Sequence, residues 1–281
     1  IIFFNLQCRF ITMNVIIKGM TFVSSLFFCG FTMAEGFGLK LDKNYYFQKK
    51  DDKQIEITVA NESNKLLFAD ILMYEGLLDK KTDSIIFDFN NKVLNYDIFP
   101  QQIAIPAGQK RTVKLIRAGN SKHIVNGEEY FRIRAIPKSP DEAVKANPDL
   151  LKLLSPTDLR DIEDSDKVKG SLRVFVGSGS VLVIQNDLNV RAENIKAVVK
   201  KNANGIAFKI INNSPKTVRF NKMKAYAKGK YISLGEFALR SGKAKEIEIS
   251  IEELKLNGLN EGQFEFVTFA SQSGGEIKIP L

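Results

Sequence analysis

Short runs of alternating apolar and polar residues cover most of the chain, and polar turns separate them. Alternation with a period of two residues places the apolar side chains on one face of a β-strand. In the first half the pattern predicts strands at 40–47, 54–60, 67–74, 85–89, 99–105, 111–117 and 130–136. In the second half it predicts strands at 190–200, 206–212, 217–227, 231–234, 245–251, 263–270 and 276–279. Short strands at this spacing are typical of β-sandwiches, so the pattern predicts two all-β domains.

The segment Ser139–Asp166 breaks this rhythm with prolines and many charged residues. Pro140, Pro148 and Pro156 are spread along it, and only 148–154 is compatible with a helix. We therefore expect a long loop. A loop of this length in a compact domain is usually functional or mobile.

An extended apolar strand at 167–186 is predicted directly after this loop. One face of this strand carries Leu172, Val174 and Val176, and the other carries Arg173 and Phe175. The glycines and serines of 177–180 are expected to interrupt the strand, and residues 181–184 resume it. Glycines inside a strand pattern mark a bulge or a close approach of another group to the backbone.

The first 34 residues have the features of a cleaved export signal. Lys18 precedes an apolar run at 20–31, and the small residues Thr32 and Ala34 suit a signal-peptidase site. The run is shorter than the ~20 residues that span a membrane, although an uncleaved anchor or a buried helix is the alternative. We expect residues 1–12 to be upstream sequence translated from a misassigned start, cleavage near Ala34 and no stable membrane insertion.

Both cysteines, Cys8 and Cys29, lie in this leader. The expected mature chain therefore has no disulfide and depends on its hydrophobic core. The net charge of +9 fits an acidic partner or simple solubility equally well. No arginine–aromatic pattern indicates binding to nucleic acid.

Residues that carry catalytic chemistry are sparse. The one histidine, His123, lies in a polar loop, and the common zinc ligand sets are absent from the expected mature chain. Residues 177–180 lack the lysine and the following helix of a phosphate-binding loop. The carboxylates of Glu128, Glu129 and 161–166 are expected to be solvated charges on loops. The sequence thus predicts no catalytic residue, no metal site and no cofactor, and a protein that is not an enzyme.

Several motifs follow one another in a definite order. They are Leu41–Phe47, Ile105–Gly108 with Thr112–Leu115 after it, Glu128–Pro137, Ile210–Pro215 and Ser273–Gly275. In this order they resemble the PapD-like family, the periplasmic chaperones of chaperone–usher pilus assembly. The most specific match is the Arg-Ala-Ile-Pro sequence at 134–137, which is similar to the Arg-x-Ile-Pro end of a family strand. Gly179–Ile184 looks closer to the divergent branch that serves alternate-type and common-pilus fimbriae.

The resemblance implies an all-β fold of two immunoglobulin-like β-sandwich domains in tandem, at 35–187 and 188–281. It implies a periplasmic chaperone in fimbrium biogenesis. Such a chaperone binds pilus subunits, completes their unfinished sandwich with a donated β-strand and delivers them to an outer-membrane usher. The sequence leaves open which pilus is served, and whether the free protein caps itself as a homodimer.

The same resemblance assigns roles to individual residues. Leu172, Val174 and Val176 would enter the groove of a subunit, although by alternation alone they could equally face the chain's own core. The family holds the subunit's C-terminal carboxylate with two basic residues. Here Asn44 stands at the first position. The second position is Arg173 in one register and Val181 in a register shifted toward the glycines. The candidate anchors are therefore Arg173, Lys40, Lys43, Arg132 and Arg134.

Two other functions are compatible with an exported all-β chain. A fimbrial structural subunit or adhesin with two β-sandwich domains would need a free alternating N-terminal extension, and residues 35–40 are too short for one. A secreted enzyme or carbohydrate-binding module would need carboxylates or aromatic rings gathered on one face. The sequence shows no such cluster and contains no tryptophan.

Overall fold

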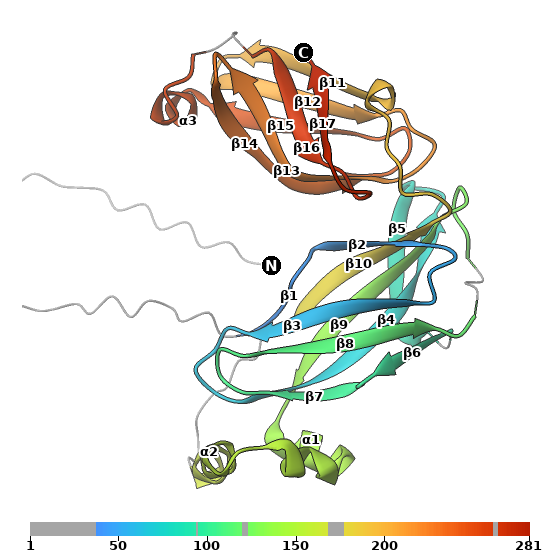
Figure 1. Ribbon diagram of the computed structural model, residues 1–281, viewed down its shortest axis with the longest axis vertical. Coiled ribbons are helices and arrows are strands. Elements are labelled where there is room, and N and C mark those ends of the chain that lie inside the picture. Colours follow the sequence, from blue (N-terminus) through green and yellow to red (C-terminus); the bar gives the residue numbers. More distant parts are fainter. Residues whose placement is uncertain (1–37, 94, 120–122, 168–176, 261–263) are drawn as a thin grey trace, which may run out of the picture. The chain divides into compact units, whose positions relative to one another are not determined.

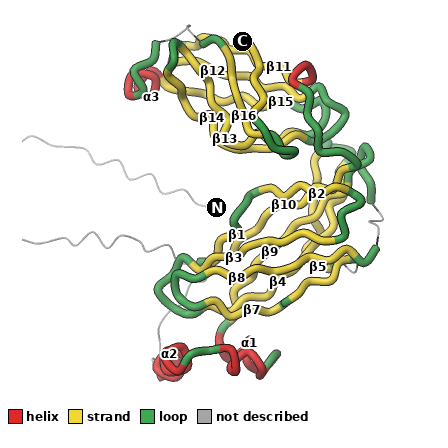
Figure 2. The backbone as a smooth tube through the Cα atoms, in the orientation of Figure 1, coloured by secondary structure: helices red, strands yellow, loops and turns green. Residues whose placement is uncertain are grey.

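The structure, a computed structural model, describes residues 38–281 except 94, 120–122, 168–176 and 261–263. This part of the chain consists mainly of strands, arranged as two β-sandwiches (Figure 1, Figure 2). The predicted fold class, two immunoglobulin-like β-sandwiches in tandem, is confirmed. None of the helices that the structure describes is long and apolar enough to cross a membrane. The predicted leader at 1–34 lies outside the described residues.

The first sandwich packs two sheets over a shared core. One sheet has the order β1–β3–β8–β6, with strands at Leu39–Leu41, Gln54–Asn61, Lys110–Arg117 and Tyr96–Phe99. The other has the order β2–β10–β9–β4–β5, with strands at Tyr45–Lys49, Ser178–Gln185, Glu129–Lys138, Leu67–Asp79 and Ser84–Lys92. Strand β7 (Gln102–Ile105) also pairs with β4. Period-two alternation explains the core, because Val113 and Leu115 of β8 are fully buried between exposed neighbours.

The strand predicted at 40–47 is wrong in one respect, because it divides into β1 and β2 on opposite sheets. The Asp42 carboxylate holds the turn between them. It accepts hydrogen bonds from the Thr58 backbone N–H, at 3.0 Å, and from the Tyr46 hydroxyl. The division places β2 beside β10, and these two strands pair in parallel along Val181–Gln185.

The long loop predicted at 139–166 is wrong. The segment forms α1 (Pro140–Ala146), the 3₁₀-helix η1 (Pro148–Leu153) and α2 (Pro156–Lys167). Each of the three prolines is the first residue of its helix, a position at which the missing N–H has no helical partner to lose. Ser139 and Glu142 form a capping box at the start of α1, and Asn147 caps η1. The prolines therefore start helices instead of breaking them.

The second sandwich pairs a three-stranded sheet with a four-stranded one. The first has the order β11–β12–β15, at Ile195–Asn202, Gly205–Asn212 and Ala244–Ser250. The second has the order β14–β13–β16–β17, at Lys230–Leu239, Val218–Ala227, Phe266–Ala270 and Glu276–Pro280. The strand predicted at 190–200 begins later than expected because the 3₁₀-helix η2 (Ala192–Asn194) precedes it. A short helix, α3 (Ile251–Leu256), follows β15.

Both sandwiches contain the same loop motif, Asn-x-Ser-x-Lys, at 61–65 and 212–216. The Asn212 side-chain amide donates to the Lys216 carbonyl at 2.7 Å and to the Leu239 carbonyl at 2.8 Å. Its amide oxygen accepts from the N–H and the hydroxyl of Ser214. Asn61 makes the equivalent bonds in the first sandwich, at the same distances to both carbonyls. Each asparagine thus pairs polar groups that would otherwise be buried without partners.

Replacing Asn212 with alanine should lower the free energy of unfolding by about 2–4 kcal/mol, because the Ser214 and Leu239 groups would lose their partner. Urea unfolding followed by circular dichroism measures this change. The matched control is Asn213→Ala, which removes an exposed side chain from the same loop and should cost less than ~0.5 kcal/mol. Equal losses in the two variants would contradict the bridging role of the Asn212 amide.

Candidate functional site

The candidate site lies on the outer face of the β2–β10–β9–β4–β5 sheet, the face turned away from the first core. On β9, Phe131 and Ile133 are fully buried in that core. Arg132 and Arg134 alternate with them and therefore project from the outer face. In the strand register, Arg132 lies opposite Val181 of β10. Two of the predicted anchor residues thus stand side by side on one strand and one face.

Gly179 of β10 leaves room for the guanidinium of Arg132. A Cβ atom on Gly179 would lie 2.8 Å from Nη2 and 2.9 Å from Nε of Arg132. A Cβ atom on Gly177 would lie 2.9 Å from the Ala135 carbonyl oxygen. The predicted close approach to these glycines is confirmed. The predicted interruption is wrong, because β10 runs unbroken from Ser178 to Gln185.

An aromatic side chain supports the second arginine. The guanidinium of Arg134 lies 4.9 Å from the ring centroid of Phe89 on β5, a cation–π contact. Phe89 is half exposed, and it meets Tyr74 edge-on with ring centroids 5.1 Å apart. The ring of Phe89 therefore fixes the position of this guanidinium at a partly exposed place on the face.

The two arginines form an uncompensated positive site. No carboxylate of the described residues makes an ion pair with Arg132 or Arg134. Burial lowers the pKa of Arg132, and the positive charge of Arg134 lowers it further. The side chain nevertheless stays protonated at neutral pH. A carboxylate bound here would relieve the repulsion and accept charge-assisted hydrogen bonds.

Apolar clusters flank this arginine pair on both sides along the face. One cluster lies beneath the helical segment and contains Phe68, Ala104, Ala143 and Leu150. The other contains Val125, Tyr130 and Val183, with Phe47, Leu78, Ile85, Phe87 and Val181 packed against them. In the β4–β9 register the arginines lie between the two clusters. Helix α1 and the neighbouring 3₁₀-helix η1 therefore cover only one end of this outer face (Figure 1).

The edge of β10 is only partly covered by β2. Strand β2 pairs with Val181–Gln185 and reaches no further upstream. Upstream of Val181, the Ser178 hydroxyl accepts a hydrogen bond from the Leu41 N–H at 3.1 Å, and the Ser180 hydroxyl donates one to the Lys43 carbonyl. Among the described strands, β9 alone pairs with residues 178–180. The predicted groove residues Leu172, Val174 and Val176 and the predicted anchor Arg173 lie just upstream, outside the described residues.

The two predicted lysine anchors have acidic neighbours. Lys40 belongs to β1 in the opposite sheet, and its ammonium lies 2.9 Å from the Glu62 carboxylate. The ammonium of Lys43 lies 4.0 Å from the Asp42 carboxylate and 5.5 Å from the ring centroid of Tyr46. Of the anchor candidates that the structure describes, only Arg132 and Arg134 share a strand and a face.

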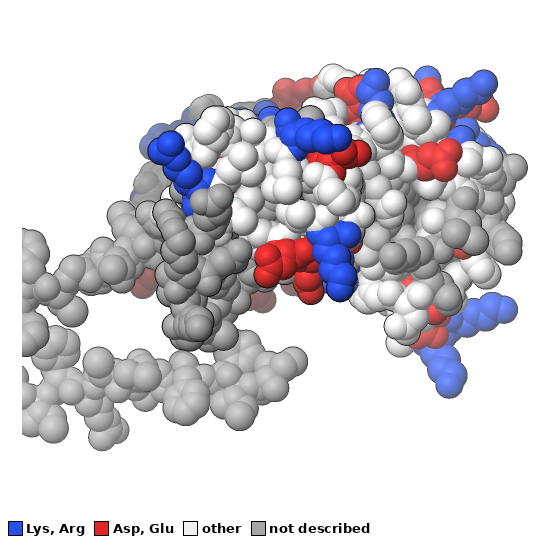
Figure 3. Space-filling view, turned by 90° about the horizontal axis from the view of Figure 1, so that it is seen from below, with Lys and Arg blue, Asp and Glu red and all other residues white. Residues whose placement is uncertain are grey.

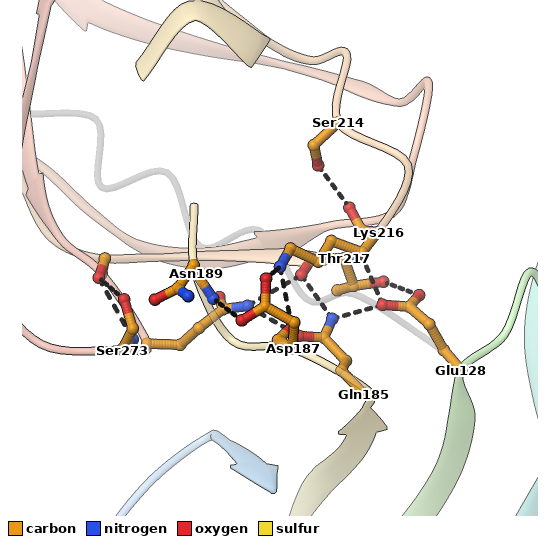
Figure 4. Close-up of polar contacts among 10 residues, drawn as sticks. Glu128, Gln185, Asp187, Asn189, Ser214, Lys216, Thr217 and Ser273 are labelled. Atoms are coloured by element: carbon orange, nitrogen blue, oxygen red, sulfur yellow. Dashed lines mark hydrogen bonds and ion pairs between the residues drawn. The ribbon is translucent and has the colours of Figure 1, made fainter. Parts of the chain in front are cut away.

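Glu128 is the centre of a buried hydrogen-bond network (Figure 4). Its Oε1 accepts from the Thr217 backbone N–H at 2.7 Å and from the Gln185 side-chain amide. Its Oε2 accepts from the Thr217 hydroxyl at 2.7 Å and from the Tyr130 hydroxyl. Burial raises the pKa of Tyr130, and the Glu128 carboxylate raises it further. The network joins the start of β9, the end of β10 and the residue before β13.

The expectation that Glu128 and Glu129 are solvated loop charges is wrong, since they are 4% and 1% exposed. Glu129 is the first residue of β9 and forms a buried ion pair with Arg117 of β8, with Nη2 and Oε1 2.5 Å apart. Residues 161–166 belong to α2 and not to a loop. Sequence reasoning missed the two glutamates because adjacent acids resemble a surface turn, and their partners are distant in the chain.

The charged side chains that Figure 3 shows do not define a comparable site. On the face shown in Figure 3, the coloured basic and acidic side chains are interspersed, without a broad area of one sign. No group of three or more His, Cys, Asp or Glu residues in the described part is placed to hold a metal ion. His123 is exposed, and its backbone N–H donates to Glu75 at 3.3 Å. The arginine pair is therefore the site for which the geometry suggests a ligand, a carboxylate.

No protein-family model matches the chain, and no curated protein sequence matches it. Among solved structures, the CupB2 chaperone of Pseudomonas aeruginosa is 11% identical, with a TM-score of 0.44 over 86% of this chain and 100% of that one. The E. coli chaperone DraB is 13% identical, with a TM-score of 0.43 over 87% of this chain and 96% of that one. A structure of the Salmonella enterica SafA pilin in complex with the SafB chaperone matches at 14% identity, with a TM-score of 0.44 over 87% and 97%. At identities and TM-scores this low, the comparisons carry no argument about function, so the function of this chain has to be argued from its own residues.

Replacing Glu128 with glutamine should lower the free energy of unfolding by about 2–4 kcal/mol, because the new amide would face the donors of Thr217 and Gln185. The urea midpoint measures this loss. Glu56→Gln is the control, since the Glu56–Lys114 ion pair is exposed and surface pairs contribute at most ~1 kcal/mol. A Glu128 variant no less stable than the Glu56 variant would refute the network's structural role.

Proposed function

We propose that this chain is a periplasmic chaperone of the PapD-like family, which binds pilus subunits through a donated β-strand and delivers them to an outer-membrane usher. The proposal includes an export signal at 1–34, an N-terminal chaperone domain at 35–187 and a C-terminal domain at 188–281. It includes no catalytic step. The ordered motifs in both halves of the chain support it, and the geometry of β10 gives it a mechanism.

The observation that carries the proposal is the edge of β10 that β2 covers only in part. At residues 178–180, β9 pairs with one edge, and β2 does not reach the other. The apolar residues of the preceding segment, Leu172, Val174 and Val176, are here called the donor residues. A strand of a subunit can add to this edge through main-chain hydrogen bonds, while the donor residues fix its register.

The directions of the side chains assign different roles to different parts of the strand. Leu182 and Ile184 enter the chain's own core, whereas Gly179 lies on the outer face beside Arg132. In a strand extended in the same register, the even-numbered donor residues would point as Leu182 does. They would then fill the open core of a bound subunit. Arg173 would share the outer face with Arg132.

The arginine pair is the proposed anchor for the subunit's C-terminal carboxylate. Asn44 stands at the first of the two positions at which the resemblance implies basic residues. Arg173 stands at the second in one register, and Val181 stands there in the shifted register. Arg132 lies directly opposite Val181 on the neighbouring strand, and its guanidinium reaches over Gly179 of the same strand. A basic group is therefore supplied from β9 in place of β10. Arg134 adds a second charge on the same face, which favours a carboxylate.

The alternative, a fimbrial subunit or adhesin, fits the first sandwich less well. Such a subunit lacks one strand and exposes a core groove. Here β10 lies between β2 and β9 of its own chain, and Leu182 and Ile184 are 0% and 1% exposed. Size-exclusion chromatography separates the two functions, because a subunit should polymerise and a chaperone should stay small or bind one client.

Replacing the three donor residues together with serine should abolish recovery of a pilus subunit co-expressed in the periplasm, because the subunit core would stay open. Co-purification on a tag carried by the chaperone, followed by immunoblotting of the subunit, measures recovery. The matched control replaces Ile86, Ile116 and Ile124 with serine, since these isoleucines are exposed elsewhere on the first sandwich. Undiminished recovery with the donor variant would overturn the assignment.

Replacing Arg132 with alanine should reduce subunit recovery about tenfold, because one charge-assisted contact to the carboxylate is lost. The loss should vanish for a subunit whose C-terminus is extended by a short Gly-Ser tail, which moves the carboxylate out of reach. Gly179→Ala should act in the same direction, because the added Cβ would displace the Arg132 guanidinium.

Arg111→Ala serves as the control for the arginine variants, since Arg111 is exposed on β8 in the other sheet. The Arg132 variant's thermal midpoint reports whether the fold itself is changed. An Arg132 effect of equal size on the native and the tailed subunit would exclude a carboxylate anchor.

A further inference from the structure

A second positive surface lies on the outer face of the β14–β13–β16–β17 sheet, in the second sandwich. Val267 and Phe269 of β16 are fully buried in the core, so the residues between and beside them face outward. Among the outward residues, the register places an aromatic row of Tyr231, Tyr226 and Phe266 beside a polar row of Lys224, Thr268 and Lys278. The next row carries Asn221, Ala270 and Glu276. The six residues of the first two rows are called the lysine–aromatic face.

The rings of the aromatic row are in contact with one another. Tyr226 and Phe266 are stacked, with ring centroids 4.9 Å apart and planes that meet at 17°. Tyr231 is tilted against Tyr226, with centroids 5.7 Å apart and planes at 46°. The three rings therefore form one continuous row across β14, β13 and β16, on which neighbouring side chains can rest.

Two ammonium groups are fixed on the faces of these rings. The Nζ atom of Lys278 lies 3.6 Å from the centroid of Phe266, and that of Lys224 lies 4.2 Å from the centroid of Tyr231. Neither lysine pairs with a carboxylate of any residue that the structure describes. Strand β16 lies between β13 and β17, so the Cα atoms of the two lysines are about 10 Å apart.

Thr268 stands between the two lysines, opposite Lys224 on one side and Lys278 on the other. It is 4% exposed, and its hydroxyl has no hydrogen-bond partner among the residues that the structure describes. A buried hydroxyl left unpaired destabilises the fold. A ligand acceptor that displaces a lysine stem would remove this cost, and this places the centre of a binding surface at Thr268.

We propose that the lysine–aromatic face binds an extended acidic peptide segment of a partner protein. Its charges are spread across a sheet surface, which suits a chain of carboxylates better than one small anion. Single-stranded nucleic acid would need free ring faces for its bases. Here neighbouring rings and ammonium groups occupy those faces. The face uses none of the residues proposed to bind a pilus subunit.

Isothermal titration of the full chain with a synthetic oligoglutamate peptide at low ionic strength tests the proposal. We expect binding that weakens with added salt, and about tenfold weaker binding when Lys224 and Lys278 are both replaced with glutamine. Glutamine removes the charge and keeps part of the apolar stem. Tyr231→Leu should also weaken binding, because it removes the ring on which the Lys224 ammonium rests. This variant keeps both lysine charges.

The matched control is the Lys200→Gln, Lys209→Gln variant, which makes the same change in net charge on exposed positions of the other sheet. Equal weakening by this control, or no binding of the peptide by the unchanged chain, would overturn the proposal. Tighter binding of oligothymidylate or of phosphatidylglycerol vesicles through the same two lysines would also overturn it, and would identify nucleic acid or an anionic membrane as the partner instead of an acidic peptide. Subunit recovery should be unaffected in the Lys224, Lys278 variant, so the chaperone function is tested separately.

Discussion

The main-chain pairing of β10 with β9 on one side and β2 on the other is the interaction on which the rest of the first sandwich depends. It brings Leu182 and Ile184 into the core between the sheets. Among the described strands, it leaves residues 178–180 without a strand partner on the side of β2, where the Ser178 and Ser180 hydroxyls bond to Leu41 and Lys43. In the proposed mechanism this edge would be the site of strand addition.

The same pairing explains why glycines interrupt an otherwise apolar strand sequence. Glycine weakens a strand, because it has no side chain to pack and loses much conformational freedom. At Gly179 the empty space is filled by the guanidinium of Arg132. A partly buried cation without a carboxylate is costly, and a bound anion would remove that cost. Arg132 thus packs against glycine, and Arg134, Lys224 and Lys278 rest on aromatic rings instead of on acids, which leaves their charge available to a ligand.

Most strands could be predicted from the sequence, because burial alternates along each of them and the alternation is a local signal. The helices at 140–167 could not, because proline breaks a helix interior but is favoured at the first helical position, where Pro140 and Pro156 stand. The arginine pair was among the predicted anchors, but its packing against Gly179 depends on the β9–β10 register, which no single strand encodes. Glu128 was missed for the same reason, because its partner Thr217 is 89 residues away.

The Glu128 network links the register of β10 to the proposed function. Gln185, the last residue of β10, donates to Glu128 and to the Thr217 carbonyl and accepts from Gln272 at 2.9 Å. A slip of β10 by one residue would break these bonds and turn Leu182 out of the core. The end of the strand is therefore fixed in one register. In the proposed mechanism the same register would decide which way the donor residues face, so this network would set which side chains a subunit receives.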